Sequence, residues 1–369
     1  MRIMQVVNIQ PYNAAAWYAL TLSRLLRRAG HEVLVVTLPD SLAGRMATKM
    51  NLRVDPLELN TLNPLAVPGL YLRMRRLARS FSPHIINCHS GEAFLLWGLL
   101  REEFKAIRLV RTRGSQNLPQ DNVPNRILHR RIADAVIVTN SDIGAHFRDL
   151  LQVPKDKLWV VSGGVDTRHF RYDPEGRRRV RAEFGYTGQE FVIGLLGSFK
   201  QSKGHREIIQ SVASLRHDFD LHHIRLLLIG HSDAFDESRI KAWIAQHGIE
   251  QITSITGVRR DVSACISALD AAAIPSTQAE AIPRTALELM ACECPTVASA
   301  TGALKDLFSP PALIPAGDVP ALTVTLARLA KHEHMRQEWR RNQLSTVAQL
   351  TENDFLQHTL TVYETLLSC

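Results

Sequence analysis

The sequence predicts an α/β fold with enough residues for two domains. The chain has 369 residues, of which 45% are hydrophobic and 22% are charged, which is an ordinary composition for a globular protein. Short apolar runs that fit buried strands alternate with segments of helical periodicity along most of the chain. The clearest unit is residues 271–299, where an apolar run, a polar loop, a helical segment near Pro283 and a second apolar run follow one another.

The first 165 residues open with a strand, a helix and a second strand. Residues 1–7 are strand-like, residues 14–29 have apolar residues at helical spacing, and Gly30 is suited to end that helix. The loop at residues 10–14 contains no glycine, so it does not fit a dinucleotide-binding G-x-G-x-x-G loop. The later elements predicted here are a basic amphipathic helix at residues 68–81 and strands near residues 83–91, 107–114 and 133–141.

The second half continues the alternation after a charged stretch at residues 173–181, which we expect to hold a linker and the first helix of a second domain. No run of 18 apolar residues occurs, so we expect no membrane span. The start of the chain fits a strand and not a signal peptide. The predicted elements are strands at residues 191–197, 224–230, 271–275 and 296–299 and a final helix at residues 353–367.

Two glutamates lie in the loop and helix of residues 275–302. Glu280 is in the loop, and Glu288 is one turn into the helix, four residues after Arg284 and on the same side. Open parallel sheets bind ligands in loops of this kind, and the start of a helix attracts phosphate. Because carboxylates accept hydrogen bonds from sugar hydroxyls, the combination suits a nucleotide sugar. Taken alone, two acids at this spacing also fit a solvated loop and an ordinary helix.

The segment PSTQAEAIPRTALELMACECPTVAS resembles the donor site of the retaining group 1 (family 4) glycosyltransferases. Ala281 replaces the glycine that usually follows the first glutamate, and Glu293 stands where a glycine often occurs. The resemblance implies the GT-B fold, in which two Rossmann-like domains face each other across a cleft and the C-terminal helix crosses back to the first. We therefore expect an acceptor-side domain at residues 1–168, a nucleotide-sugar donor domain at residues 169–350 and the returning helix at residues 351–369.

A lysine in the second domain also follows the family pattern. Lys203 and Gly204 match the lysine–glycine pair of the segment that holds the donor diphosphate, although a surface lysine is the plain alternative. Ser198 stands where the family has an arginine, so one positive charge is missing from this segment. Lys200 or Arg284 is a candidate to replace that charge.

Other segments complete the resemblance. Residues 160–170 resemble the family's interdomain hinge, where the pair Gly163 and Gly164 is expected to absorb unusual dihedral angles. Residues 252–261 resemble the segment whose backbone meets the nucleobase, which places Val258 and Arg259 beside the base. The remaining donor contacts that the resemblance implies are Gly197 and Ile282.

The acceptor side of the family pattern falls in the first domain. Residues 83–91 resemble a strand whose end reaches the ligand, with His89 and Ser90 at that end, although His89 also fits a structural histidine. Arg113 closes the next strand and offers a planar fork for phosphate or carboxylate. The polar loop at residues 115–125 follows it and is expected on the acceptor side.

The resemblance implies a metal-independent transferase that takes the sugar of a nucleotide diphosphate sugar and passes it, with retention, to a hydroxyl of an envelope glycan or lipopolysaccharide core. Lys203 and the helix start at Arg284 would neutralise the leaving diphosphate, Glu280 would bind donor sugar hydroxyls, and Glu288 would bind the ribose. We count Glu280, Lys203 and His89 as the catalytic candidates. No bound cofactor and no metal are expected.

The net charge of +8 limits the classes of binding partner to consider. No nucleic-acid-binding module is present, so an anionic membrane surface or an acidic lipid acceptor is the better expectation, with solvated helix faces as the alternative. The five scattered cysteines fit inert thiols in a reducing compartment, and we expect a cytoplasmic protein that can attach to the inner face of the membrane. The arginines cluster at residues 24–28, 73–79, 126–131 and 177–181.

Two other function classes remain open. Nucleotide-sugar 2-epimerases share the expected fold, and acids and histidines on both sides of the cleft would favour an isomerase. A catalytically degenerate binding subunit would explain the departures at Ser198, Ala281 and the first loop. The retained Glu280, Lys203 and Glu288 favour the transferase.

Overall fold

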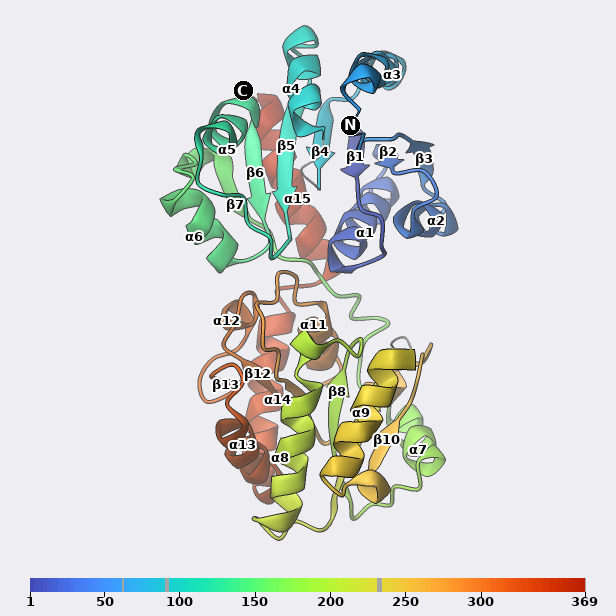
Figure 1. Ribbon diagram of the computed structural model, residues 1–369, viewed down its shortest axis with the longest axis vertical. Helices are drawn as coiled ribbons and strands as arrows, with labels where there is room; N and C mark the ends of the chain where they lie inside the picture. Colours follow the sequence, from blue (N-terminus) through green and yellow to red (C-terminus); the bar gives the residue numbers. More distant parts are fainter. Residues whose placement is uncertain (62, 90–92, 231–233, 369) are drawn as a thin grey trace. The chain divides into compact units, whose positions relative to one another are not determined.

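The computed structural model describes residues 1–61, 63–89, 93–230 and 234–368. Its contacts divide the chain into two compact units: Met1–Gly163 with Glu352–Cys369, and Gly164–Thr351. Each unit is an α/β domain built on one parallel sheet (Figure 1). The predicted fold class of two Rossmann-like domains is therefore confirmed.

The first unit has a seven-stranded sheet in the order β3-β2-β1-β4-β5-β6-β7. All neighbouring strands in it run parallel. Its predicted strands are confirmed, with β5 at residues 108–113 and β6 shorter than the predicted 133–141. The strand bounds are β1 (Arg2–Val7), β2 (Glu32–Thr37), β3 (Arg53–Pro56), β4 (Ile85–Cys88), β5 (Arg108–Arg113), β6 (Ala135–Val138) and β7 (Leu158–Val160).

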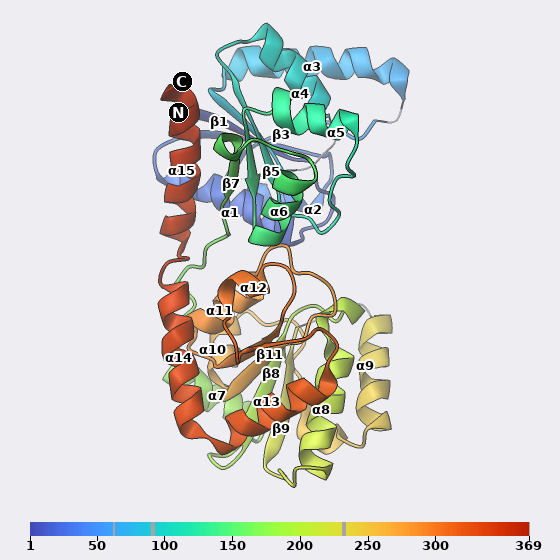
Figure 2. The ribbon, with the colours of Figure 1, turned by 90° about the vertical axis from the view of Figure 1, so that its left-hand side faces the viewer.

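Helices cover both faces of this sheet. Parallel crossovers are right-handed, so the helices that precede β2 and β3 lie on one face and those that precede β4 to β7 lie on the other. Figure 2 shows α3, α4 and α5 side by side, and α3 and α4 are in contact. The first face carries α1 (Ala14–Arg28) and α2 (Leu42–Lys49); the second carries α3 (Val67–Phe81), α4 (Phe94–Glu103), α5 (Val123–Ile127) with the π turn Leu128–Ile132, and α6 (Ser141–Asp149).

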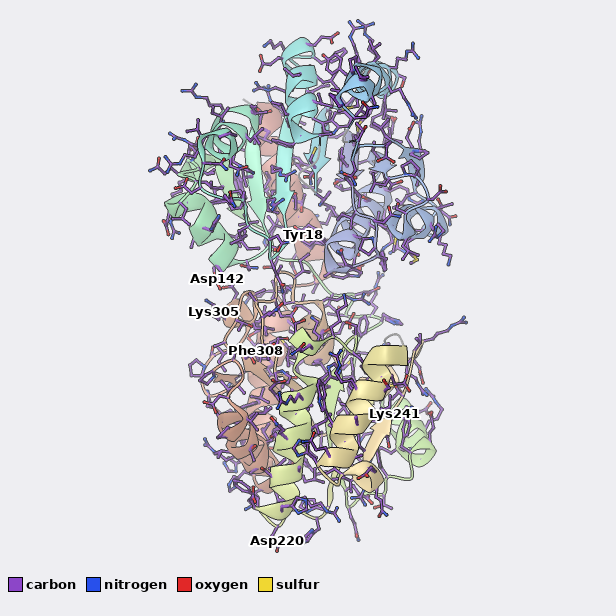
Figure 3. The ribbon with its side chains drawn as sticks, viewed as in Figure 1. Tyr18, Asp142, Asp220, Lys241, Lys305 and Phe308 are labelled. Carbon is purple, nitrogen blue, oxygen red and sulfur yellow. The ribbon has the colours of Figure 1, made fainter. Side chains whose placement is uncertain are left out.

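The C-terminal helix α15 (Glu352–Ser368) belongs to the first unit, which confirms that the chain end returns there. Phe355 packs on Tyr18 of α1, with ring centroids 4.5 Å apart, and Tyr18 is labelled in Figure 3. The buried Tyr363 hydroxyl accepts hydrogen bonds from Gln5 Nε2 at 3.2 Å and Asn87 Nδ2 at 2.9 Å. These contacts tie the helix to β1 and β4.

The second unit has a six-stranded sheet in the order β10-β9-β8-β11-β12-β13. The predicted strands are confirmed as β8, β9, β11 and β12, whereas β10 and β13 were not predicted. β13 spans only two residues and is too short to show a periodicity. The strands are β8 (Phe191–Leu196), β9 (Ile224–Ile229), β10 (Thr253–Ile255), β11 (Ala271–Ile274), β12 (Thr296–Ser299) and β13 (Leu313–Ile314). The helices are α7 (Pro174–Glu183), α8 (His205–His217), α9 (Ala234–Gln246), α10 (Val262–Ser267), α11 (Arg284–Ala291), α12 (Leu304–Leu307), α13 (Val319–Lys331) and α14 (Glu333–Val347).

Each sheet contains one point where the strand order reverses. In the first unit this switch point lies between β1 and β4, and in the second it lies between β8 and β11. The strands on either side of a switch point send their following loops in opposite directions, which opens a crevice at their carboxyl ends. The ligand sites of both units are therefore expected at these two places.

The expected role of the glycine pair in the hinge is wrong in one detail. Gly163 and Gly164 do not adopt a left-handed φ. Gly163 instead lies close to the Trp17 ring, since a Cβ there would be 3.2 Å from it. In α3, Leu70 and Met74 are buried in the core with exposures of 7% and 0%, so this side of the basic amphipathic helix packs inward.

The cysteines that the structure describes are buried and form no disulfide. Burial raises the pKa of Cys88 and of Cys292 to about 12, so both remain thiols at physiological pH. Among the described residues, no helix combines the length and the apolar composition of a membrane span.

Candidate functional site

The loops after β8 and β11 meet at the switch point of the second unit. β8 and β11 are adjacent parallel strands, so their carboxyl ends lie at the same edge. The amide of Thr277 in the second loop donates to the Ser202 carbonyl in the first at 3.0 Å. This contact brings the predicted lysine and the predicted loop glutamate together.

Lys203 and Glu280 form an ion pair at this edge. The Lys203 ammonium lies 2.7 Å and 2.9 Å from the two carboxylate oxygens of Glu280. Ser276 Oγ donates to Glu280 Oε1 at 2.6 Å, and Ser276 is buried. The Glu280 side chain is 13% exposed and that of Lys203 31%, so both groups are accessible to a ligand while the carboxylate is held in one orientation.

Two glycines allow these loops to approach closely. Gly204 has φ +76°, and a Cβ there would lie 2.0 Å from the Pro275 carbonyl oxygen. Gly302 has φ +50°, and a Cβ there would lie 2.3 Å from the Glu280 carbonyl oxygen, which accepts from the Ala303 amide at 2.7 Å. A side chain at either position would move the backbone that carries Lys203 or Glu280.

Glu288 lies on the buried side of α11 and pairs with Arg284 one turn earlier. Arg284 Nε donates to Glu288 Oε1 at 2.7 Å. Burial raises the pKa of Glu288, and the positive charge and hydrogen bond of Arg284, with His169 nearby, act against that rise. The apolar side of α11, Ala286, Leu287, Leu289, Met290 and Ala291, is buried as the sequence predicts.

The start of α11 carries no side-chain cap. Its N-cap position is Pro283, which accepts the Leu287 amide through its carbonyl at 3.1 Å. Ile282, a predicted donor contact, is only 4% exposed and packs in the interior. The helix start therefore keeps the positive end of its dipole beside the loop that carries Glu280.

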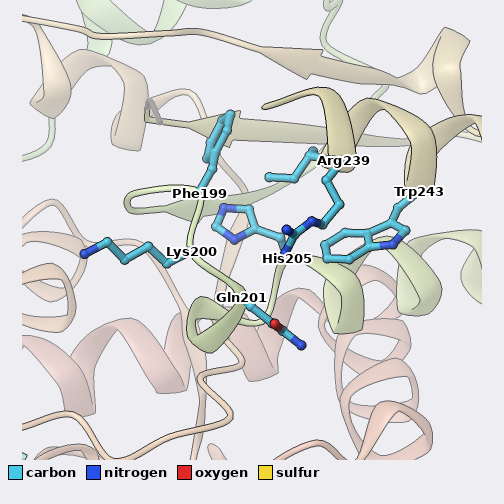
Figure 4. Close-up of a pocket in the computed structure, with 7 residues that line it drawn as sticks. Phe199, Lys200, Gln201, His205, Arg239 and Trp243 are labelled. Atoms are coloured by element: carbon cyan, nitrogen blue, oxygen red, sulfur yellow. The ribbon is translucent and has the colours of Figure 1, made fainter. Parts of the chain in front are cut away.

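The two candidates to replace the missing arginine at Ser198 differ in their surroundings. Arg284 is engaged with Glu288, whereas Lys200 is exposed. In Figure 4, Lys200 extends away from His205 and Arg239, which line a small pocket with Trp243. Replacement of the arginine by either residue stays a prediction.

The predicted nucleobase contacts occupy the loop after β10. Val258 is 75% exposed. The Arg259 side chain binds Glu183 at 2.6 Å and Asp261 at 2.9 Å, so it ties this loop to α7. Gly197, at the end of β8, donates its amide to the Ile229 carbonyl at 2.9 Å.

His89 follows β4 at the switch point of the first unit. It is 6% exposed, and its Nε2 donates to Gln5 Oε1 on β1 at 2.6 Å. Burial, together with the nearby Arg111, lowers the pKa of His89 to about 3. His89 is therefore neutral at physiological pH, and its contact with substrate stays a prediction. Ser90 lies outside the described residues.

Arg113 holds the loop that follows it. Arg113 Nη2 donates to the Asn117 carbonyl at 2.7 Å, and His146 Nε2 lies 2.9 Å from the Pro119 carbonyl. Asn125 Nδ2 donates to the Gln120 carbonyl at 2.8 Å. The long polar loop at residues 115–125 is thus fastened by three side chains.

Sequence reasoning missed Ser276 and Gly302. Ser276 is the first residue after the Pro275 that ends the strand pattern, which was a usable signal for a position at the ligand edge. Gly302 is distant in sequence from Glu280, and only the folded chain reveals their backbone contact.

Comparison with known proteins adds the family. "Glycosyl transferases group 1" matches residues 176–345, and "Glycosyltransferase Family 4" matches residues 15–169. The chain belongs to the group 1 glycosyltransferases. One relative is the MMP alpha-(1->4)-mannosyltransferase of Mycolicibacterium hassiacum. It is 29% identical to this chain over 206 residues, which cover 54% of this chain and 46% of the relative. The chain thus spans about half the length of the curated relatives it matches.

Solved structures show the same fold over the whole length. A glycosyltransferase from Rickettsia africae has a TM-score of 0.88 at 17% identity and covers 99% of this chain and 98% of its own. Anabaena HepE in complex with UDP and glucose has a TM-score of 0.82 at 18% identity, with all of both chains covered. The lipopolysaccharide outer core galactosyltransferase WaaB has a TM-score of 0.75 at 15% identity and covers 99% of each chain. The two-domain architecture of this group 1 member is accordingly the GT-B fold.

Proposed function

We propose that the chain transfers a sugar from a nucleotide diphosphate sugar to a hydroxyl of a glycan or glycolipid, with retention of configuration and without a bound metal ion. The observation that carries the proposal is the Lys203–Glu280 pair at the switch point of the second unit. Family membership and the UDP and UDP-glucose complexes of HepE, a protein of the same fold, support it.

The pair suits the donor because its two charges match the two halves of a nucleotide diphosphate sugar. Breaking the bond between sugar and diphosphate leaves negative charge on the phosphate and positive charge on the sugar carbon. The Lys203 ammonium and the uncapped start of α11 stabilise the first charge. When Lys203 turns to the phosphate, Glu280, still oriented by Ser276, accepts hydrogen bonds from the sugar hydroxyls.

We assign Glu288 to the ribose of the donor and the loop containing Val258 and Arg259 to the base. The acceptor is proposed on the first unit, beside His89 and Arg113. The fold shared with two lipopolysaccharide glycosyltransferases, WaaB and WaaG, supports an envelope glycan or lipopolysaccharide core as its class. Such an acceptor fits a cytoplasmic enzyme that works at the inner face of the membrane.

The test combines binding and transfer. A panel of nucleoside diphosphates and their sugars is screened by thermal shift, because a ligand that binds only the folded chain raises its melting temperature. The matching donor is then incubated with envelope glycans, and the anomeric configuration of the product is read by NMR with and without a chelator. Lys203→Met and Glu280→Gln should lower kcat by roughly 10²-fold or more.

Lys241→Met is the matched control, because Lys241 also pairs with a glutamate but is 63% exposed and lies on α9 (Figure 3). It should transfer sugar at the wild-type rate. Nucleotide binding without turnover would point to a degenerate binding subunit, and interconversion of the donor sugar without transfer would point to an isomerase. Either result would overturn the proposal.

A further inference from the structure

The four arginine clusters of the sequence have different surroundings in the structure. In the cluster at residues 24–28, Arg24 pairs with Glu352. In the cluster at residues 177–181, Arg177 and Arg181 bind Asp270 at 2.6 Å and 3.1 Å. These paired arginines hold their own units together.

The other two clusters are directed to solvent. They lie on α3 and on the segment formed by α5 and the π turn after it. The acids nearby are already engaged, since Glu103 pairs with Arg75 and Asp121 pairs with Arg126. Within these two clusters, the exposed arginines that have no acidic partner among the described residues are Arg73, Arg76, Arg130 and Arg131.

Exposed leucines occur on the same elements. Among the described residues, the four leucines that are more than half exposed all belong to α3, to the turn Pro64–Ala66 before it, or to α4. They are Leu65 at 88%, Leu72 at 51%, Leu95 at 55% and Leu99 at 51%. Isolated exposed leucines need no explanation, but their restriction to two adjacent helices and the turn before the first of them does.

These leucines and arginines share one side of the first unit. α3, α4 and α5 cover the same face of the sheet and lie side by side (Figure 2). Met74 of α3 and Trp97 of α4 are fully buried, so the exposed residues of both helices point away from the sheet. We call Leu65, Leu72, Leu95, Leu99, Arg73, Arg76, Arg130 and Arg131 the leucine–arginine surface.

We propose that the leucine–arginine surface binds an anionic lipid bilayer, an inference that rests on the proposed function because an envelope acceptor brings the enzyme to a membrane. Residues 64–81 contain four arginines and no acidic residue, which matches the charge of acidic lipids. Apolar side chains beside basic ones are the pattern of helices that lie in the bilayer interface. A second copy of the chain fits less well, because a symmetric contact would place arginines against arginines.

Vesicle cosedimentation tests this surface. The purified chain is mixed with vesicles of phosphatidylcholine alone or with vesicles of phosphatidylcholine and phosphatidylglycerol. The acidic headgroups of phosphatidylglycerol make the second kind of vesicle negative at its surface. We expect binding to the anionic vesicles that weakens with salt. Arg73→Gln with Arg76→Gln should weaken it by about fivefold for each arginine. Leu72→Glu with Leu99→Glu should weaken it by roughly tenfold or more.

Matched controls use residues of equal exposure elsewhere. Leu42→Glu with Val324→Glu changes two side chains that are each 48% exposed, on α2 and α13, and Arg168→Gln with Arg178→Gln removes two charges outside the surface. All variants should keep the nucleotide-induced thermal shift, which reports the donor site independently of lipid.

Three results would overturn the inference: wild-type chain that does not prefer anionic vesicles, surface and control variants that bind equally, or a dimer in sedimentation velocity that Leu72→Glu with Leu99→Glu dissociates. A wild-type chain that binds no nucleotide would instead count against the proposed function. It would leave the vesicle result unaffected.

Discussion

Glu288 is a charged group in a position that disfavours its charge. Its carboxyl is buried, and burial raises its pKa even though Arg284 donates to it at 2.7 Å. A buried carboxylate at the proposed donor site fits a binding role, because it can accept hydrogen bonds from ligand hydroxyls.

We predict that Glu288→Gln abolishes the nucleotide-induced thermal shift while leaving the melting temperature of the free chain unchanged or higher. The raised pKa means that the folded state binds the proton more tightly than the unfolded state. The carboxylate therefore lowers stability above its folded pKa, and this cost fades as pH falls towards the unfolded value. The advantage of the glutamine variant should shrink on acidification, as measured by thermal melts at several pH values.

Glu250→Gln changes an exposed acid of the same unit and serves as the control. It should alter neither the nucleotide shift nor its dependence on pH. A Glu288→Gln chain that binds the donor normally would remove Glu288 from the proposed site.

His89 leads to a prediction with the opposite dependence on pH. Its pKa of about 3 in the folded chain lies below the ordinary value of 6.5, so the unfolded chain takes up a proton that the folded chain refuses. Stability should fall as pH drops from 6.5 towards 3, by about 1.4 kcal/mol per pH unit from this group. The free energy of unfolding of His89→Gln, measured with urea at several pH values, should fall less steeply on acidification than that of the wild type. His217→Gln, at an exposed histidine, should follow the wild type.

At the scale of elements, one hydroxyl connects the C-terminal helix to the first sheet. Tyr363 on α15 receives the side-chain amides of Gln5 on β1 and Asn87 on β4, and Asn87 Oδ1 accepts from Thr112 on β5 at 2.8 Å. This buried network joins three strands and the helix, so its members depend on one another.

We predict that Tyr363→Phe destabilises the first unit by about 1–3 kcal/mol, because two buried amide groups lose their acceptor. Denaturant unfolding measures the change. Tyr71→Phe is the matched control, since its hydroxyl donates to Glu103 at the surface at 3.3 Å, and it should cost less than about 0.5 kcal/mol. Equal effects of the two substitutions would show that the buried network is unimportant.

The loops at the second switch point show how backbone conformation positions charge. Gly204 and Gly302 are the residues whose missing side chains let three loops come together around Glu280. The charges alone would not define the site, because Lys203 and Glu280 are 77 residues apart and meet only through this backbone packing.

At the scale of the whole molecule, the chain has two separate sheets and two cores. We predict that calorimetry resolves two unfolding transitions and that a donor nucleotide raises only the transition of the second unit, because the proposed donor-binding residues lie between Gly164 and Thr351. Tyr363→Phe should lower the temperature of the first unit's transition only. The two changes together assign each transition to its unit. A single transition that both changes shift together would show that the units unfold as one.

The family resemblance implied the return of the last helix. The sequence by itself determined the strand and helix alternation and the central motif. These features depend on local periodicity and on neighbouring residues, which a linear chain displays directly. The buried side of α11 and the strands β8, β9, β11 and β12 were predictable for that reason.

Only the tertiary structure decided which groups meet and which face solvent. It paired Lys203 with Glu280, brought Ser276 and Gly302 to the same carboxylate, and turned Leu70 and Met74 inward. It also showed which arginines of the clusters are engaged within their units, such as Arg24 and Arg177, and which are exposed, such as Arg73 and Arg130. Such facts depend on residues far apart in the chain and on the packing of whole helices against a sheet, and no local pattern of residues encodes them.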